Sequence, residues 1–137
     1  MNRIEQKELD ELMDRAYEAR DHSYAPYSKF HVGACLLAGS GKRYMGCNIE
    51  NAAFTPTICA ERTALFTAVY QGERDFDAIA IACTGDEPAF PCGVCRQALS
   101  EFCDPAMPVY CGSAKGERVL TTLGELLPKS FGPKDLL

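Results

Sequence analysis

The sequence of 137 residues contains no tryptophan, only two histidines and no long run of apolar residues. A helix that spans a bilayer needs roughly 20 consecutive apolar residues, and no segment here approaches that length. Positive charge is also scarce, because 14 lysines and arginines face 19 aspartates and glutamates, which gives a net charge of -5. Such a chain is poorly suited to bind nucleic acid or an anionic membrane surface through charge alone. We therefore expect neither as a partner.

The N-terminal segment lacks the apolar stretch of a signal peptide, since Met1 to Asp10 is mostly polar. A cytoplasmic location is therefore expected. Internal repeats and linker-like Gly/Ser runs are absent as well. With 47% hydrophobic residues, a chain of this length can form one core but not two. We expect a single domain over residues 1–137.

Cysteine is the residue present in unusual number, at eight of 137 positions. This share is below the roughly 8–10% of a disulfide scaffold in a short secreted chain, and the apolar content is sufficient for folding without cross-links. In a reducing compartment, most of these thiols should be core residues, while a subset binds metal or reacts.

Apolar periodicity predicts an alternation of helices and strands. Leu9, Leu12, Met13 and Ala16 recur at helical spacing and predict an amphipathic helix that ends near His22. Further helices are expected over 60–69, over 94–102 and after a capping box at 122–125, and strands over 30–38, 43–49, 78–83, 109–111 and 118–120. Strand, helix, strand, helix, strand is the order of βαβ units, which predicts a largely buried sheet with helices on both faces.

Three cysteines stand where loops enter predicted helices. Cys59 precedes one helix, and Cys92 and Cys95 open the next. Free backbone N–H groups and the positive end of the helix dipole favour a thiolate at such positions. Two helices of a βαβ arrangement can begin at the same end of the sheet, so the three sulfurs can converge. Three protein ligands leave a tetrahedral zinc ion one open position, as in a catalytic site.

Two charged residues follow the first of these cysteines. Glu61 is two positions beyond Cys59 and is placed to move protons beside the metal rather than to bind it. Arg62 can donate hydrogen bonds to the thiolate sulfurs and offset their negative charge. Each pattern has an ordinary alternative on its own: a redox pair for Cys92 and Cys95, a buried structural thiol for Cys59, and solvated side chains for Glu61 and Arg62. Arg96 is predicted to lie on a helix surface.

Several segments together resemble a known family. Zinc deaminases share the signature H-x-E followed by P-C-x-x-C, in which cysteine can replace the histidine. This chain contains Cys59-x-Glu61 and Pro91-Cys92-x-x-Cys95. From about residue 24 to 131 it resembles the short cytidine deaminases, in the segments PYSKFHVGA (26–34), GCNIENAAF (46–54), CAERTALF (59–66) and PCGVCRQ (91–97).

The resemblance implies a fold and a reaction. The fold is a three-layer α/β/α arrangement with a central mixed five-stranded sheet. The reaction is the zinc-dependent hydrolytic deamination of cytidine and deoxycytidine to uridine and deoxyuridine, with release of ammonia, in pyrimidine salvage. Cys59, Cys92 and Cys95 would ligate one Zn²⁺ per chain. Zinc-bound hydroxide would attack C4 of the cytosine ring, while Glu61 carries the proton to N3 and assists the departure of ammonia.

The resemblance also assigns residues to the substrate. Phe30 would pack near the nucleoside, Asn48 and Glu50 would hydrogen-bond the ribose hydroxyls, and Ala60 would line the binding site. Phe131 matches a C-terminal aromatic that reaches a neighbouring subunit's site, which implies a homotetramer with shared active sites. The segment of about 122–137 would then contribute to subunit contacts.

The chain departs from the family pattern at a few positions. Phe54 stands where tyrosine is common, Val94 replaces a more usual alanine, and the Thr55-Pro56-Thr57 run is unusual. Val94 is interpreted as a packing change, whereas the changes at Phe54 and over 55–57 motivate one rival hypothesis, a deaminase of a related cytosine nucleoside analogue or antibiotic. A rival of another class is a non-catalytic zinc-stabilised binding module, in which Glu61 would be dispensable.

Overall fold

The computed structural model describes residues 4–137. The elements are α1 (Gln6–Arg20), β1 (Val32–Ala38), β2 (Arg43–Cys47), α2 (Ala60–Tyr70), β3 (Phe76–Cys83), α3 (Gly93–Ser100), β4 (Pro108–Gly112), β5 (Arg118–Thr122), α4 (Leu123–Leu126) and the 3-10 turn η1 (Pro133–Asp135). Each helix and strand expected from periodicity is present, with ends shifted by a few residues. Half of the expected capping box is present: Thr122 Oγ1 accepts a hydrogen bond from the backbone N–H of Glu125, whereas the Glu125 carboxylate accepts from the Thr122 hydroxyl rather than from its backbone N–H.

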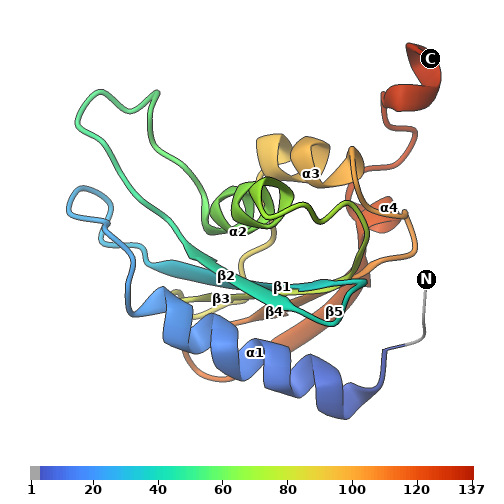
Figure 1. Ribbon diagram of the computed structural model, residues 1–137. Helices are drawn as coiled ribbons and strands as arrows, with labels where there is room; N and C mark the ends of the chain where they lie inside the picture. Colours follow the sequence, from blue (N-terminus) through green and yellow to red (C-terminus); the bar gives the residue numbers. More distant parts are fainter. Residues whose placement is uncertain (1–3) are drawn as a thin grey trace.

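The five strands form one mixed sheet in the order β2-β1-β3-β4-β5. β1 is antiparallel to both β2 and β3, β3 is parallel to β4, and β4 is antiparallel to β5. Helix α1 covers one face, whereas α2 and α3 cover the other (Figure 1). The predicted three-layer α/β/α architecture with a five-stranded mixed sheet is therefore confirmed.

Strand β1 supplies side chains to two separate cores because its residues alternate between the faces of the sheet. Leu36 is fully buried in the cluster that includes α2 and α3, whereas Cys35 and Leu37 belong to the cluster under α1. Burying a large aliphatic side chain contributes roughly 1.5–3 kcal/mol. These two apolar layers hold the helices against the sheet.

Two glycines let helices approach adjacent strands closely. A Cβ atom at Gly46 on β2 would lie 2.5 Å from the carbonyl oxygen of Ala60 and from the backbone nitrogen of Ala64. A Cβ atom at Gly33 on β1 would overlap the backbone of Ala16 and Arg20 in α1 on the opposite face. Gly46 thus allows the first turn of α2 to press on the sheet beside the loop that carries Cys59.

The strands predicted over 30–38 and 43–49 are shorter than expected at the open end of their hairpin, because β1 begins at Val32 and β2 ends at Cys47. The side chain of Asn48 replaces strand pairing there, since its Oδ1 accepts from Val32 N and its Nδ2 donates to the Phe30 carbonyl. Beyond this point the loops around residues 21–31 and 48–59 project past the sheet, and the C-terminal segment stands away from the body (Figure 1). Within residues 4–137, no helix has the length and apolar character required to cross a membrane.

Candidate metal centre and nucleoside cavity

The topology explains why α2 and α3 begin side by side. β2 and β3 run in the same direction, because each is antiparallel to the strand β1 between them. Helix α2 follows β2 along the chain, and α3 follows β3. Both helices therefore start at the carboxyl-end edge of these strands and run back over the same face of the sheet. This edge is where ligands commonly bind in open α/β sheets.

The predicted cysteines converge at these two helix starts. Cys59 is the N-cap of α2, Cys92 is the N-cap of α3, and Cys95 lies in the first turn of α3. Their sulfur atoms all lie within 4.8 Å of one another, and they form the one such group of three or more potential ligands in the described residues. Neither N-cap side chain bonds the helix backbone, so the sulfurs remain available to a metal.

The spacing of the sulfurs fits a zinc ion. Tetrahedral zinc with Zn–S bonds of about 2.3 Å places its ligand sulfurs about 3.8 Å apart. The sulfurs of Cys59 and Cys92 are 3.7 Å apart. Three thiol donors and no fourth histidine or cysteine in the group match the donor number of a catalytic rather than a closed structural zinc site.

Arg62 lies beside the sulfur cluster. Its Nη2 donates to the Cys59 sulfur at 3.5 Å, and its buried Nε has no hydrogen-bond partner within the described part of the chain. A hydrogen bond from the Cys95 thiol, helped by Arg62, lowers the pKa of Cys59 to about 5. The bond to Cys59 in turn raises the pKa of Cys95. The arginine thus supplies positive charge where thiolates gather, as the sequence analysis expected of it.

Glu61 is buried, with 4% of its surface exposed. Burial raises the pKa of its carboxyl group to about 7. The side chain comes from the first turn of α2 and lines a cavity of about 260 Å³ together with Cys59 and Cys92. A carboxyl group with a pKa near neutrality can both accept and release a proton in this cavity.

The same cavity contains the residues expected to bind substrate, with one exception. Phe30, Asn48, Glu50 and Ala60 all line it. Phe131 does not, because it lies on the C-terminal segment, where its side chain is 60% exposed and its carbonyl accepts from Gln97 Nε2. Within its own chain, Phe131 is therefore separate from the cavity.

Asn48 and Glu50 are held by hydrogen bonds in the loops. The Asn48 amide bonds the backbone at Phe30 and Val32, which leaves it a second N–H and a second oxygen lone pair. The Glu50 carboxylate accepts from Ser28 Oγ and from the backbone N–H groups of Tyr27 and Ser28. The hydrogen bond from the Ser28 hydroxyl lowers the pKa of Glu50, so this side chain presents a carboxylate to the cavity.

Sequence reasoning missed part of the cavity wall. The wall also includes Ser28, Val32, Thr57, Ile58, Ile81, Ala89 and Phe90. Ala89 and Phe90 come directly before the PCxxC motif, which is a local signal that could have identified them. Thr57 closes the unusual 55–57 run, so this departure does reach the cavity. Phe54 does not line it; this residue has a positive φ of 65 and a side chain that is 74% exposed.

Two expectations about individual side chains need correction. Arg96 is not a helix-surface residue, since it is half-buried and hydrogen-bonds the Pro91 and Leu126 carbonyls. Of the five remaining cysteines, all expected in the core, four are buried but Cys47 is only half-buried, because it stands at the end of the edge strand β2.

Known proteins match both the sequence and the fold. Residues 6–111 match the family described as cytidine and deoxycytidylate deaminase zinc-binding region. A cytidine deaminase from Sporosarcina psychrophila is 49% identical over 94% of this chain and 95% of that protein. One from Halalkalibacterium halodurans is 46% identical over 91% of this chain and 95% of that protein. The crystal structure of a cytidine deaminase from Burkholderia pseudomallei superposes with a TM-score of 0.86 at 44% identity, over 89% of this chain and 98% of that one.

These matches cover the α2 and α3 helix starts, the convergent sulfurs and the glutamate beside them. The chain belongs to the cytidine and deoxycytidylate deaminase zinc-binding family.

Proposed function

We propose that this protein is a zinc-dependent cytidine deaminase that hydrolyses cytidine and deoxycytidine to uridine and deoxyuridine with release of ammonia. One observation carries the proposal: the buried carboxyl group of Glu61 and two of the three convergent sulfurs line the same cavity as Asn48 and Glu50. The cavity therefore combines a metal centre, a proton carrier and groups that recognise a sugar. Because the reaction converts one pyrimidine nucleoside into another, we propose that it serves pyrimidine salvage.

Cys59, Cys92 and Cys95 hold one zinc ion per chain in this proposal. When bound, a zinc ion with three protein ligands supplies Lewis acidity that makes water a nucleophile near neutral pH. Arg62 offsets the charge of the thiolates through its hydrogen bond to Cys59 and its positive charge near Cys95.

Glu61 moves the protons of the reaction. Hydrolysis adds a water oxygen to C4 of the cytosine ring and breaks the bond between C4 and its amino nitrogen. The carboxylate of Glu61 takes the water proton and delivers it to N3 of the ring. The carboxylate then takes the proton of the new C4 hydroxyl and gives it to the departing amine, so that the C4 carbonyl forms and ammonia leaves. A pKa raised to about 7 by burial lets one side chain serve both steps.

The loops beyond β1 and β2 recognise the nucleoside. Phe30 packs against the nucleoside, while Asn48 and Glu50 bond the ribose hydroxyls, an amide and a carboxylate offering both donors and acceptors. Ala60, which is fully buried at the start of α2, leaves space for the ring. Because the sugar contributes binding, a free cytosine base should be a poor substrate.

The test is the variant Glu61→Gln, with Glu117→Gln as the matched control at an exposed turn between β4 and β5. We expect Glu61→Gln to keep one zinc per chain and to lose about 10²–10⁴-fold in kcat, because it removes general acid–base catalysis. Glu117→Gln should match the wild type. Retained cytidine turnover in Glu61→Gln would favour the non-catalytic zinc module. Absent turnover of cytidine by the wild type, with turnover of an analogue, would favour the related-nucleoside deaminase.

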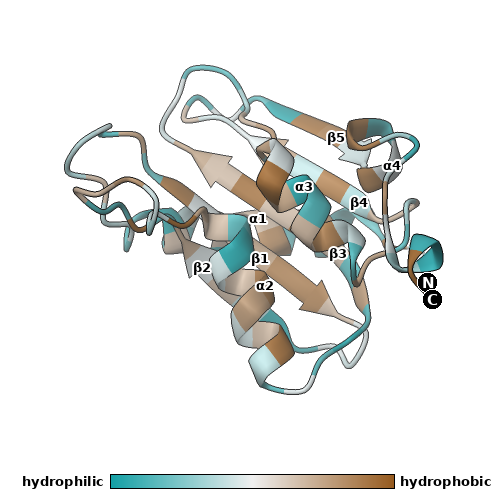
Figure 2. Cartoon of the chain, turned by 90° about the horizontal axis from the view of Figure 1, so that it is seen from above, coloured by the Kyte–Doolittle hydropathy of each residue, from teal (hydrophilic) through white to brown (hydrophobic). Residues whose placement is uncertain are grey.

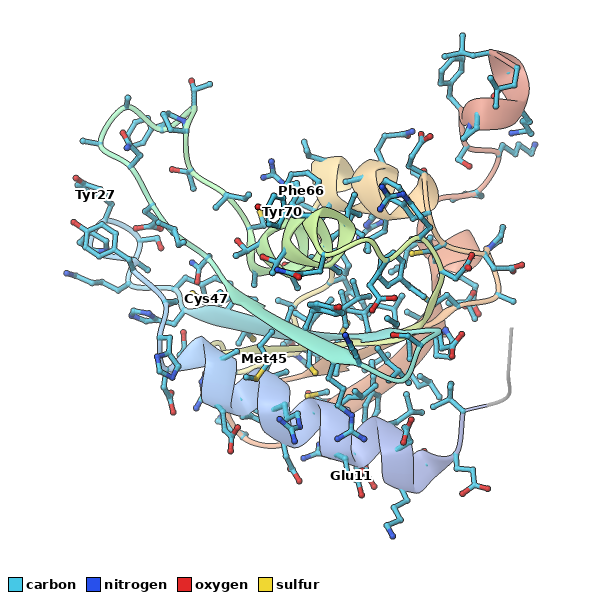
Figure 3. The ribbon with its side chains drawn as sticks, in the orientation of Figure 1. Glu11, Tyr27, Met45, Cys47, Phe66 and Tyr70 are labelled. Carbon is cyan, nitrogen blue, oxygen red and sulfur yellow. The ribbon has the colours of Figure 1, made fainter. Side chains whose placement is uncertain are left out.

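We also propose that the single domain of residues 1–137 assembles as a homotetramer with shared sites. Large apolar side chains project into solvent from α2, where Phe66 is 48% and Tyr70 is 86% exposed (Figure 3). The outer sides of α2 and α3 carry hydrophobic residues in Figure 2, including Val94 at 60% exposure. The segment of about 122–137 presents Phe131 away from its own cavity, where a neighbouring subunit could receive it.

Subunit complementation tests the sharing of sites. A Glu61→Gln chain and a Phe131→Ala chain should each be weakly active alone. Co-expressed as mixed tetramers, they should regain activity, because some sites then combine the intact Glu61 of one subunit with the intact Phe131 of another. Light scattering checks the tetramer itself. Activity of the mixture equal to the sum of its parts would overturn the sharing of sites.

The thiols support a reducing, cytoplasmic location. All eight cysteines, which lie within the described residues, are free. Disulfides are rare in compartments where thiols are kept reduced.

A further inference from the structure

Arg96 bonds the backbone on both sides of Cys92. Its Nε donates to the carbonyl oxygen of Pro91 at 2.6 Å. Its backbone N–H donates to the carbonyl oxygen of Cys92 at 2.9 Å, which is the first backbone bond of α3 and does not depend on the side chain. The first oxygen belongs to the peptide plane that precedes Cys92, and the second to the plane that follows it. Because a peptide unit is planar, fixing both oxygens fixes the direction in which the Cys92 side chain leaves the backbone.

The far end of the Arg96 guanidinium is anchored as well. Its Nη1 donates at 2.9 Å to the carbonyl oxygen of Leu126, the last residue of α4. Carbonyls at the end of a helix have no intrahelical donor, so Arg96 supplies one. Helix α4 is itself tied down, since Leu123 N donates to Met107 O and Gly124 N donates to Pro105 O. The half-buried guanidinium therefore bridges two fixed parts of the fold.

Cys92 needs such support more than its two partners. Cys95 is fully buried within α3, and the sulfur of Cys59 is held by Arg62. Cys92 is the one exposed thiol of the eight, and it stands outside the helix as the N-cap, with no side-chain capping bond. Its position depends on the orientation of the two peptide planes around it, of which the Arg96 side chain holds the first and the backbone of α3 the second.

We propose that Arg96 is a positioning residue, which holds Cys92 in place for the metal and ties that ligand to α4. The inference rests on the proposed zinc site. It gives the arginine of the CRQ sequence at 95–97 a role distinct from that of Arg62, because Arg62 contacts sulfur directly whereas Arg96 acts through the backbone. Partners that orient a metal ligand without touching the metal typically contribute about 10–100-fold in metal affinity.

The test compares Arg96→Ala with two other variants. Arg96→Lys retains a positive charge but can no longer bond two separate carbonyls through a planar fork. Arg74→Ala is the matched control, because Arg74 also donates to two backbone carbonyls, those of Val69 and Glu73, but at the other end of α2. Zinc release from each purified protein is followed with a chromogenic chelator, and the melting temperature is recorded before and after chelation.

We expect Arg96→Ala to release zinc about 10-fold faster than the wild type and Arg96→Lys to fall between them. When assayed with added zinc, Arg96→Ala should lose kcat while the KM for cytidine changes less than about twofold. Arg74→Ala should release zinc and turn over cytidine like the wild type. If Arg96→Ala does not fold, Arg96→Lys alone decides, because the proposal requires it to release zinc faster than Arg74→Ala.

Two outcomes separate this inference from the proposed function. If Arg96→Ala releases zinc at the same rate as the wild type, the positioning role is overturned, even if the melting temperature of the variant is lower. Where only Arg96→Lys folds, the same result for that variant overturns the role. Neither conclusion depends on the activity of the wild type. A wild type that holds one zinc but does not deaminate cytidine would overturn the proposed function, while the release rates would still decide the role of Arg96.

Discussion

Cys95 and Cys111 are both fully buried, yet they belong to parts of the molecule with different chemistry. Cys95 lies in the first turn of α3, within 4.8 Å of two other sulfurs. Cys111 lies within β4 among apolar side chains, and burial raises the pKa of its thiol to about 12. At the metal centre the bond to Cys59 raises the pKa of Cys95 as well, but that bond, helped by Arg62, lowers the pKa of Cys59 to about 5.

The difference shows that burial alone does not decide what a thiol does. A thiol in the middle of a strand has its backbone groups paired in the sheet and packs against apolar side chains, so burial has the largest influence on its pKa and keeps it protonated. A thiol at a helix start lies next to unpaired N–H groups and, here, next to an arginine. The position of a cysteine relative to the end of an element therefore separates the two sets.

Alkylation rates should separate the two sets most strongly. With zinc removed by a chelator, exposed Cys92 should react with iodoacetamide at once. Cys103 and Cys111 should react at least about 1000-fold more slowly, because buried thiols react only when the structure opens. Peptide mass spectrometry over a time course measures each site. Excess zinc should suppress labelling of Cys92, and fast labelling of Cys111 would show that its strand opens locally.

Removing one thiol from each set should have unequal effects on activity. Cys95→Ala should lose its zinc and more than about 100-fold in kcat, since even indirect partners of metal ligands contribute about 10–100-fold. Cys103→Ala is the control, because Cys103 lies just after the C-terminal end of α3. This variant should keep one zinc per chain and full activity. Its free energy of unfolding should fall by only about 1–2 kcal/mol. Metal analysis and denaturant titration check both, and retained zinc in Cys95→Ala would contradict its role as a ligand.

Two arginines, each beside a cysteine, provide a smaller contrast. Arg62→Ala should lower kcat about 10-fold, because it leaves the thiolate charge without its partner. Arg43 lies near Cys35 but pairs with Glu8 and Glu11 at the surface, where ion pairs are worth up to about 1 kcal/mol. Arg43→Ala should therefore leave kcat unchanged. Steady-state kinetics checks both variants, and equal kcat values would show that charge compensation at the sulfurs is unimportant.

Alkaline pH should weaken the fold through the core thiols. Burial raises the pKa of Cys103 and Cys111 to about 12 and that of Cys35 to about 11, from an ordinary value of 9.0. Above pH 9 the unfolded chain loses thiol protons that the folded chain retains, so the free energy of unfolding falls as the pH rises towards the folded pKa values. One thiol contributes at most about 1.4 kcal/mol per pH unit.

Urea titrations of zinc-free protein at pH 8 and pH 10 measure this effect. Cys103→Ala should lose about 1 kcal/mol less than the wild type between the two pH values, because one titrating thiol is missing. Identical losses would show that the core thiols do not cause the alkaline weakening.

The sequence predicted the position of the metal-binding cysteines more fully than it predicted the arrangement of the strands. Local patterns were enough to locate the helix starts that carry Cys59, Cys92 and Cys95, because loop composition and apolar periodicity change at those residues. Local patterns could not show that β2 and β3 run parallel, since this depends on the insertion of β1 between them. The family resemblance implied a mixed five-stranded sheet but gave no strand order.

Contacts between distant segments were beyond sequence reasoning. The guanidinium of Arg96 bonds a carbonyl 30 positions further along the chain, and charged side chains at helix positions are usually exposed. Gly46 is a similar case, because the backbone of α2 leaves no room for a side chain at this position. The sequence around Arg96 does not indicate its contact with Leu126, and the sequence around Gly46 does not indicate its contact with α2.

The sulfurs of Cys59 and Cys92 lie 3.7 Å apart although the two residues are separated by 33 positions in the chain. An ion shared by these sulfurs closes that stretch into a loop, as a disulfide would, and a cross-link of this length restricts the unfolded chain by about 3–4 kcal/mol on loop-entropy grounds. This cross-link opens by chelation rather than by reduction. The melting temperature of the protein should therefore rise and fall with the concentration of free zinc around it.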